Sequence, residues 1–170
     1  NGLYVLGLRK GDKIITVSNS TKNDLCEFFN CPKDKIQVIY AGFDRRLFEE
    51  SKISREKVLE KYGIDSDKKY ILFLGTLEPL KNITRLFEAF GIFKETCKKE
   101  NKRCGYKLVM AGKKGWLGGG YKQLAKDLGI AKDVIFTGYV IGDELVPLFK
   151  NADFFVMPSL YEGFGTTVLE

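Results

Sequence analysis

Two carboxylates flank a glycine loop at the end of the chain. Glu162 is followed by Gly163-Phe164-Gly165, and Glu170 comes eight residues after Glu162. Glycine lets a backbone approach a ligand closely. A helix capped by Thr166 or Thr167 would turn unpaired N–H groups and its positive dipole end toward an anion. Because the carboxylates can accept hydrogen bonds from hydroxyls beside that anion, this stretch predicts binding of a phosphate joined to a sugar.

Glycines also follow other predicted strands. The predicted strands cover residues 70–74, 106–110, 134–137 and 154–157, and the glycines after them are Gly75, Gly112, Gly138 and the Gly163/Gly165 pair. A single glycine is more simply explained as a turn. Four such sites would lie on the edge where open parallel sheets bind ligands. With a lysine after Gly112 and carboxylates in the last loop, we favour a ligand-binding edge.

The elements that must position these residues alternate regularly. Helices are predicted over residues 54–62, 83–99, 120–128 and 143–150, with Gly118–Gly120 as a mobile loop before the third. Asp143 is equally well explained as a helix cap or as a ligand contact. Upstream, a strand over 13–17 leads through Ser18 into a helix to about residue 29, and a second strand covers 36–40 before a turn at 41–44. Strands alternating with helices predict an α/β, Rossmann-like, mostly parallel sheet with helices on both faces.

Composition narrows the class of partner. The 170 residues carry 28 Lys and Arg against 22 Asp and Glu, a net charge of +6 that is compatible with nucleic acid, an acidic membrane or a phosphorylated small molecule. A solvated lysine-rich surface explains the charge more simply. Because the phenylalanines fall on expected core positions, we expect no nucleic-acid partner. Four cysteines without histidine predict reduced thiols, no metal site and a cytoplasmic protein.

Several motifs share one resemblance. Glu162-Gly-Phe-Gly…Glu170 resembles the E-x7-E element of the family 4 retaining glycosyltransferases, which have the GT-B fold. Gly75-Thr-Leu-Glu-Pro-Leu-Lys-Asn82 is similar to a GTLEPRKN form of mannosyltransferase-like members, and Val109–Trp116 and Phe136–Val140 resemble the segments after the next two strands. The resemblance runs from about Lys13 to Glu170, in the family's order and spacing.

The resemblance implies a role for each matching position. Lys81 and Glu162 match catalytic positions: the lysine on the donor diphosphate, and a carboxylate that positions the transferred sugar. Glu170 matches the acid on the ribose hydroxyls, and Val140 the backbone contact to the base. The remaining donor-binding positions are Gly75, Thr76, Gly112, Gly163, Phe164, Gly165 and Thr166.

The function implied is that of one half of a GT-B enzyme. The chain would be the C-terminal donor domain, over residues 13–170, with residues 1–12 as a residual segment and the acceptor domain missing before it. It would move a hexose, with mannose as the first expectation, from a nucleotide-diphosphate sugar to an acceptor, without metal or cofactor. We expect the isolated chain to be inactive. The net charge is compatible with peripheral membrane association of the full-length protein.

Three departures keep a second hypothesis open. Thr76 and Leu80 stand where relatives carry arginine, and Thr166-Thr167 stands where Leu-Pro is usual. These changes would also suit a degenerate nucleotide-sugar-binding or scaffold module without catalysis. The residues assign neither the base of the donor nor the acceptor.

Overall fold

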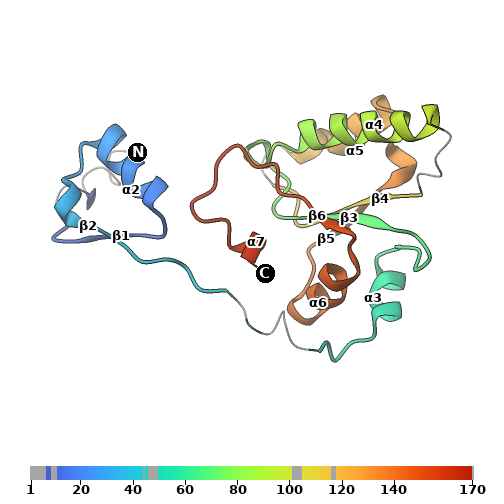
Figure 1. Ribbon diagram of the computed structural model, residues 1–170, viewed down its shortest axis with the longest axis horizontal. Helices are drawn as coiled ribbons and strands as arrows, with labels where there is room; N and C mark the ends of the chain where they lie inside the picture. Colours follow the sequence, from blue (N-terminus) through green and yellow to red (C-terminus); the bar gives the residue numbers. More distant parts are fainter. Residues whose placement is uncertain are drawn as a thin grey trace. The chain divides into compact units, whose positions relative to one another are not determined.

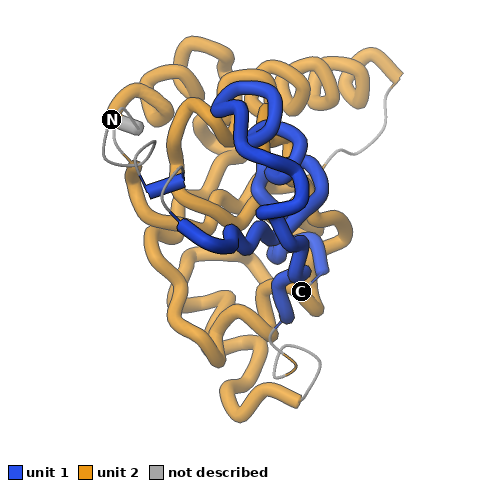
Figure 2. Tube along the Cα trace, turned by 90° about the vertical axis from the view of Figure 1, so that its left-hand side faces the viewer, with its two compact units in different colours: residues 1–44, 162–170 blue, residues 45–161 orange. Residues whose placement is uncertain are grey.

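The chain forms two compact units. A computed structural model describes residues 7–8, 11–43, 45, 50–100, 105–115 and 118–169. Unit 1 comprises residues 1–44 and 162–170, and unit 2 comprises residues 45–161 (Figure 2). Each unit has its own parallel sheet and is described by itself. The predicted division into residues 1–12 and 13–170 concerns the domains of a whole enzyme and stays a prediction.

Unit 1 is built on a two-stranded parallel sheet. Its elements are β1 (Ile14–Thr16), α2 (Asn19–Phe29), the 3-10 turn η1 (Lys33–Lys35), β2 (Ile36–Val38) and the short helix α7 (Thr166–Leu169). β1 pairs with β2 from Ile14 opposite Ile36 onward. Ser18 begins α2 as predicted, because its side-chain oxygen accepts a hydrogen bond from the Thr21 N–H at 3.1 Å.

The helix at the end of the chain begins differently from the prediction. Thr166 is the first residue of α7, so neither Thr166 nor Thr167 is its cap. The carbonyl of the preceding residue, Gly165, accepts a hydrogen bond from the Val168 N–H at 3.0 Å. The first helical bond therefore starts at Gly165, and the glycine occupies the cap position. Glu170 and Asp44, both named in the sequence predictions, lie outside the described residues.

Unit 2 contains a four-stranded parallel sheet in the order β5-β4-β3-β6. Its strands are β3 (Tyr70–Leu74), β4 (Lys107–Ala111), β5 (Val134–Gly138) and β6 (Phe154–Phe155). Every strand pair in it is parallel, which confirms the predicted α/β class. β6 is shorter than predicted, although the Val156 N–H still donates to the Leu72 carbonyl. Pro158 has no N–H with which to extend the pairing.

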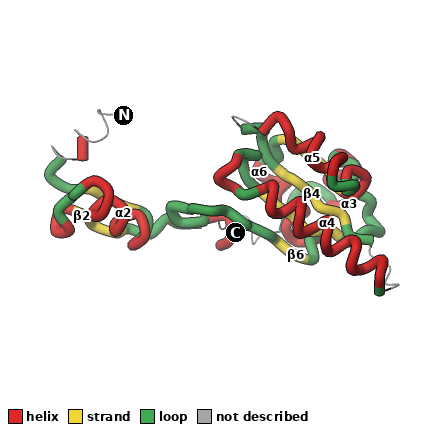
Figure 3. Tube along the Cα trace, turned by 90° about the horizontal axis from the view of Figure 1, so that it is seen from above, coloured by secondary structure: helices red, strands yellow, loops and turns green. Residues whose placement is uncertain are grey.

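Helices cover both faces of this sheet, as predicted (Figure 1). α4 (Ile83–Lys99) and α5 (Tyr121–Asp127) pack on one face, and α3 (Arg55–Lys61) and α6 (Gly142–Asn151) on the other. Alternate side chains of each strand enter opposite cores: Leu108 and Met110 pack with α4, and Val109 packs with α3 and α6. Figure 3 distinguishes these helices from the strands between them. No helix in the described part of the chain has the length and apolar character needed to cross a membrane.

The strand order creates a point where the chain reverses direction across the sheet. From β3 the chain moves outward to β4 and β5, and then returns to place β6 on the other side of β3. Open α/β sheets bind ligands at such a reversal, which here falls between the loops that follow β3 and β6. Within unit 2 these loops are joined, because the Leu160 N–H donates to the Leu80 carbonyl at 2.9 Å.

Two predictions for helix starts need correction. Ile141 precedes α6, and no side chain caps that helix, so Asp143 is a first-turn residue and not a cap. The Asp143 main-chain carbonyl accepts a hydrogen bond from the Ser51 hydroxyl at 3.2 Å. Gly118–Gly120, predicted as a loop, forms the single 3-10 turn η4 before α5.

A carboxylate fastens α3 to α6. Lys61 donates to Glu144 Oε1 at 2.5 Å, and the Tyr62 hydroxyl donates to Glu144 Oε2. The hydrogen bond from Lys61, followed by that from Tyr62, holds the pKa of Glu144 below its ordinary value. This link between α3 and α6 is relevant to the site because α6 begins at the sheet edge where ligands are expected.

We predict that Glu144→Gln destabilises the fold in a pH-dependent way. The pKa of Glu144 is lower in the folded protein than its ordinary value of 4.5. Such a carboxylate stabilises the folded state at pH values above 4.5, and this stabilisation is lost as the pH falls through the folded pKa. Glu144→Gln should lower the unfolding free energy by about 0.5–1 kcal/mol at pH 7, and the difference should shrink as pH falls below 4.5. Urea unfolding across pH 3–8 measures this. Glu88→Gln, in the exposed Arg85 pair, is the control and should change little.

Candidate functional site

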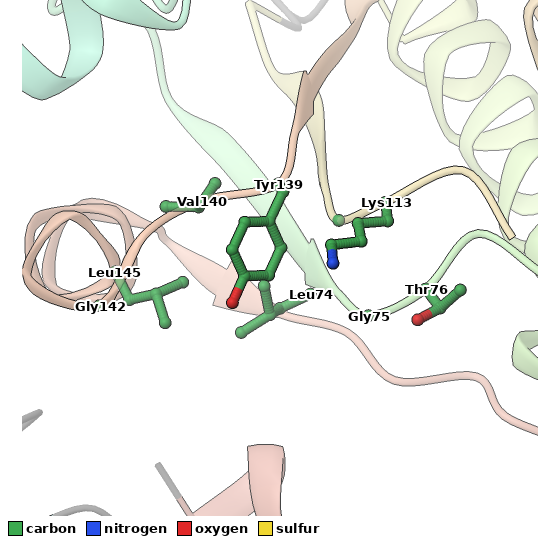
Figure 4. A pocket seen from close by; sticks show the side chains of 9 residues that line it. Leu74, Gly75, Thr76, Lys113, Tyr139, Val140, Gly142 and Leu145 are labelled. Atoms are coloured by element: carbon green, nitrogen blue, oxygen red, sulfur yellow. The ribbon is translucent and has the colours of Figure 1, made fainter.

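A hollow of about 460 Å³ lies at the carboxyl edge of the unit 2 sheet. It is lined by Leu74, Gly75, Thr76, Gly112, Lys113, Tyr139, Val140, Gly142 and Leu145 (Figure 4). These residues follow the ends of β3, β4 and β5 and reach the first turn of α6. The hollow therefore occupies the edge that the strand-ending glycines predicted.

Four predicted donor-binding residues meet in this hollow. Gly75 and Thr76 follow β3, Gly112 follows β4, and Val140 follows β5. They are separated by up to 65 positions in the sequence, and the parallel order of the strands brings them together. Their roles toward a ligand stay predictions.

The floor of the hollow is a close contact between two backbones. Gly112 has a φ of +149°, and a Cβ built on it would lie 1.8 Å from the carbonyl oxygen of Gly75. The Gly75 N–H donates to Ala111 at 2.9 Å and the Gly112 N–H donates to Gly138 at 2.8 Å, so the ladder continues past the strand ends. Only glycine fits at position 112 without moving the neighbouring chain.

The two loops above this contact are also hydrogen-bonded to each other. The Leu77 N–H donates to the Lys113 carbonyl at 2.8 Å, and the Gly115 N–H donates to the Leu77 carbonyl at 3.1 Å. Leu77 and Lys114 form a parallel bridge. These bonds hold the backbones of Thr76 and Lys113 in place before any ligand arrives.

Lys81 ends the 3-10 turn η3 (Pro79–Lys81) after β3. Asn82 follows in the left-handed region, with a φ of +55°, and begins α4. The Cε atom of Lys81 lies 3.8 Å from the point where a Cβ of Gly75 would be. The turn therefore directs the lysine stem back toward Gly75, although Lys81 does not itself line the hollow.

The predicted carboxylate loop belongs to unit 1. Phe164 stacks on Tyr40 with ring centroids 5.7 Å apart. The Gly163 carbonyl accepts from the Thr21 hydroxyl at 3.5 Å. These contacts hold Gly163 and Phe164 within their own unit. Glu162 belongs to unit 1 and Lys81 to unit 2, so the catalytic roles that the resemblance implies for them stay predictions.

Sequence reasoning gave Lys113 no specific role, and it missed Tyr139, Leu74 and Leu145 among the side chains that line the hollow. The Lys113 ammonium lies 4.6 Å from the centroid of the Tyr139 ring, a cation–π distance. In Figure 4 the Lys113 side chain extends toward that ring. Both residues come directly after a glycine on the ligand edge, at Gly112 and Gly138, and that position is the signal that could have identified them.

A second, smaller hollow of about 250 Å³ lies beside the same loops. Its lining residues are Leu77, Lys114, Gly119, Tyr121, Lys122 and Phe136. Consecutive lysines therefore serve different hollows: Lys113 lines the larger one and Lys114 the smaller. Burial, and then the charge of Glu78, raise the pKa of Tyr121, so its hydroxyl stays neutral at ordinary pH.

The two ends of the larger hollow differ in chemistry. Leu74, Val140 and Leu145 supply apolar surface at the α6 end. Thr76, with the glycine backbone around it, supplies polar groups at the β3 end, near Lys81. This arrangement can hold a molecule with a flat apolar part and an anionic part. Among the described residues, no group of three or more His, Cys, Asp or Glu gathers to hold a metal.

Two family models match the chain. The model described as "Glycosyl transferases group 1" matches residues 54–170, and that of "Glycosyltransferase Family 4" matches residues 2–47. An uncharacterised glycosyltransferase of Methanocaldococcus jannaschii is 40% identical over 163 residues, covering 93% of this chain and 39% of that protein. O-antigen chain mannosyltransferase B of Escherichia coli is 33% identical over 158 residues, covering 92% and 40%.

A solved structure has a similar fold. HepE of Anabaena, crystallised in complex with UDP and glucose, gives a TM-score of 0.76 at 20% identity. The match covers 99% of this chain and 44% of that protein. The chain thus spans about 40% of the length of the relatives it matches.

We predict that Gly112→Ala is strongly destabilising. The added methyl group would collide with the Gly75 carbonyl, and the φ of +149° is strained for alanine. The expected loss of unfolding free energy is about 3 kcal/mol or more, measured by urea unfolding. Gly142→Ala is the matched control, because it lines the same hollow with nothing within 4 Å of an added Cβ. Equal stabilities of the two variants would contradict the prediction.

Proposed function

Because this chain belongs to the group 1 glycosyltransferases, as its motifs indicated, we propose that it forms the donor-binding half of a retaining enzyme. The enzyme would move a hexose from a nucleotide-diphosphate sugar to an acceptor. The observation that carries this proposal is the hollow at the carboxyl edge, which gathers Gly75, Thr76, Gly112 and Val140 from three strands.

The shape of a nucleotide-diphosphate sugar matches the two ends of this hollow. A nucleobase has flat apolar faces that suit Val140 and Leu145, while a diphosphate carries charge that suits amides and a nearby ammonium. HepE, which shares the fold, is a protein crystallised with UDP and glucose. We infer the same ligand class here.

Mannose is the sugar we propose for the donor. Support comes from relatives whose names specify this sugar, including O-antigen chain mannosyltransferase B at 33% identity and the serotype-specific mannosyltransferase WbdA at 29%. The similarity of Gly75–Asn82 to a form found in mannosyltransferase-like members agrees with it.

Lys81 and Glu162 are the residues we propose for the chemistry. As the glycosidic bond breaks, negative charge grows on the leaving diphosphate, and an ammonium placed there lowers the barrier. The approach of the Lys81 stem to Gly75 supports this role. Glu162 would position the hexose and stabilise developing positive charge on it. Its place in a loop fixed by the Phe164 stack suits a positioning residue.

We predict that the chain binds GDP-mannose or UDP-glucose and that Lys81→Ala weakens this binding. Loss of a charged contact to phosphate costs about 1.5–3 kcal/mol, which is about a tenfold or larger rise in Kd. Isothermal titration calorimetry measures it. Lys126→Ala on exposed α5 is the control for the loss of one positive charge and should leave Kd unchanged. If the unaltered chain binds neither sugar nucleotide, the alternative of a scaffold module without a functional donor-binding site is favoured.

We further predict that this chain alone binds its donor but transfers sugar poorly. In the family it belongs to, the acceptor is held by a second domain, and reaction requires both substrates at once. The measurement is release of nucleoside diphosphate with the 170-residue chain and with the full-length protein, at equal concentration. Turnover by the chain as fast as that of the full-length protein would contradict the need for a second domain.

A further inference from the structure

We propose that Lys113, held over Tyr139, selects donors by their base and favours uracil or guanine over cytosine or adenine. The inference rests on the proposed function, because it assigns a specificity residue to the same hollow. Lys113 is a specificity-determining residue in this proposal and takes no part in breaking the glycosidic bond. The argument starts from the order of the strands.

Strand order sets the direction in which a donor lies. Across the edge the sequence of strands is β5, β4, β3, so Tyr139, Lys113 and Thr76 follow one another along the hollow. Figure 4 shows the Lys113 side chain between Tyr139 and Thr76. A ligand lying along the hollow therefore passes Lys113 between its two ends.

The anionic end of the donor belongs at β3. Gly75 and Thr76 offer backbone and a hydroxyl there, and the stem of Lys81 approaches Gly75. Placing the diphosphate at this end leaves the other end for the nucleoside. Lys113 then lies on the nucleoside side, because its ammonium extends away from Thr76 toward Tyr139.

The β5 end suits a base. Val140 is buried, and Leu145 and Leu74 complete an apolar wall against which a planar ring can pack. The residue Tyr139 is 64% exposed, so it keeps surface available for a ligand. A heteroaromatic ring is the part of a nucleotide sugar that gains most from such surroundings.

The Lys113 ammonium can distinguish one base from another. It carries three hydrogen-bond donors and no acceptor, and within the described part of the chain it forms no ion pair. The 4.6 Å contact with Tyr139 limits where the ammonium can point. The Lys113 ammonium is therefore a hydrogen-bond donor of restricted direction that can bind an acceptor on a ligand.

Bases differ in the group that would face the Lys113 ammonium. On the edge away from the ribose, uracil presents O4 and guanine O6, which accept hydrogen bonds. At the corresponding position cytosine presents the N4 amino group and adenine the N6 amino group, which only donate. Two hydrogen-bond donors that face each other both lack an acceptor, and this weakens the binding of the amino bases. Lys113 should thus favour oxo bases.

The test compares four nucleoside diphosphates on four proteins. Binding of UDP, GDP, CDP and ADP is measured by calorimetry with the 170-residue chain and with Lys113→Met, Lys114→Met and Tyr139→Leu. Methionine keeps the unbranched stem and removes the charge. Lys114 is the matched control because it is the next residue but lines the other hollow. Circular dichroism and thermal unfolding verify that each variant is folded.

The expected result is a loss of preference and not a general loss of binding. The unaltered chain should bind UDP and GDP about tenfold or more tightly than CDP and ADP, because a hydrogen bond to a charged group is lost with the amino bases. Lys113→Met should weaken UDP and GDP to the level of the other two. Tyr139→Leu should reduce the preference, and Lys114→Met should retain it.

Other outcomes overturn the inference in distinguishable ways. Equal weakening of all four ligands by Lys113→Met would mean that the lysine contacts phosphate, and the base assignment would be wrong. Equal affinity of the unaltered chain for all four would also overturn it, while leaving the proposed donor site intact. Binding of none of them would remove the proposed function itself.

Discussion

The close approach of two backbones at Gly75 and Gly112 is the constraint on which the rest of unit 2 depends. Neighbouring strands normally keep enough room for side chains, but here a Cβ on one loop would lie 1.8 Å from the carbonyl oxygen of the other. Because Gly112 has no side chain, the loops can approach this closely, and the ladder runs past the strand ends, from Gly75 to Ala111 and from Gly112 to Gly138. The bonded loop ends form a rigid floor with polar groups that need no reorganisation when a ligand binds.

The framework around this floor was predictable because each part repeats a simple pattern. β3 and α4 have the predicted bounds, since long apolar runs and stripes specify burial at many positions at once. The predicted caps failed at Asp143 and Thr166, where one polar residue among several could begin a helix. The start of α7 at Gly165 depends on a main-chain hydrogen bond from the Val168 N–H, and residue types do not predict such a bond.

The site was predictable to the extent that backbone geometry requires glycine. Gly75 and Gly112 were found for that reason, and the resemblance added Thr76 and Val140. Lys113 was missed as a site residue because its contact with Tyr139 joins different loops. In the sequence, Lys113 and Lys114 are adjacent lysines, and nothing about their residue type predicts different positions for them. The pairing of Leu77 with these loops directs them to separate hollows, so only the fold distinguishes their functions.

The residues proposed for donor binding and sugar transfer are divided between the two units of this chain. The hollow belongs wholly to unit 2, while Glu162 and the Phe164 stack belong to unit 1. Leu160, two residues before Glu162, is bonded to Leu80 within unit 2. In the proposed function, the hollow in unit 2 supplies part of the nucleotide contacts, and the loop in unit 1 would supply further donor contacts and orient the hexose. Thr76 lies in the hollow and Thr166 in unit 1, and both are predicted donor-binding positions, so neither departure by itself distinguishes an enzyme from a binding module.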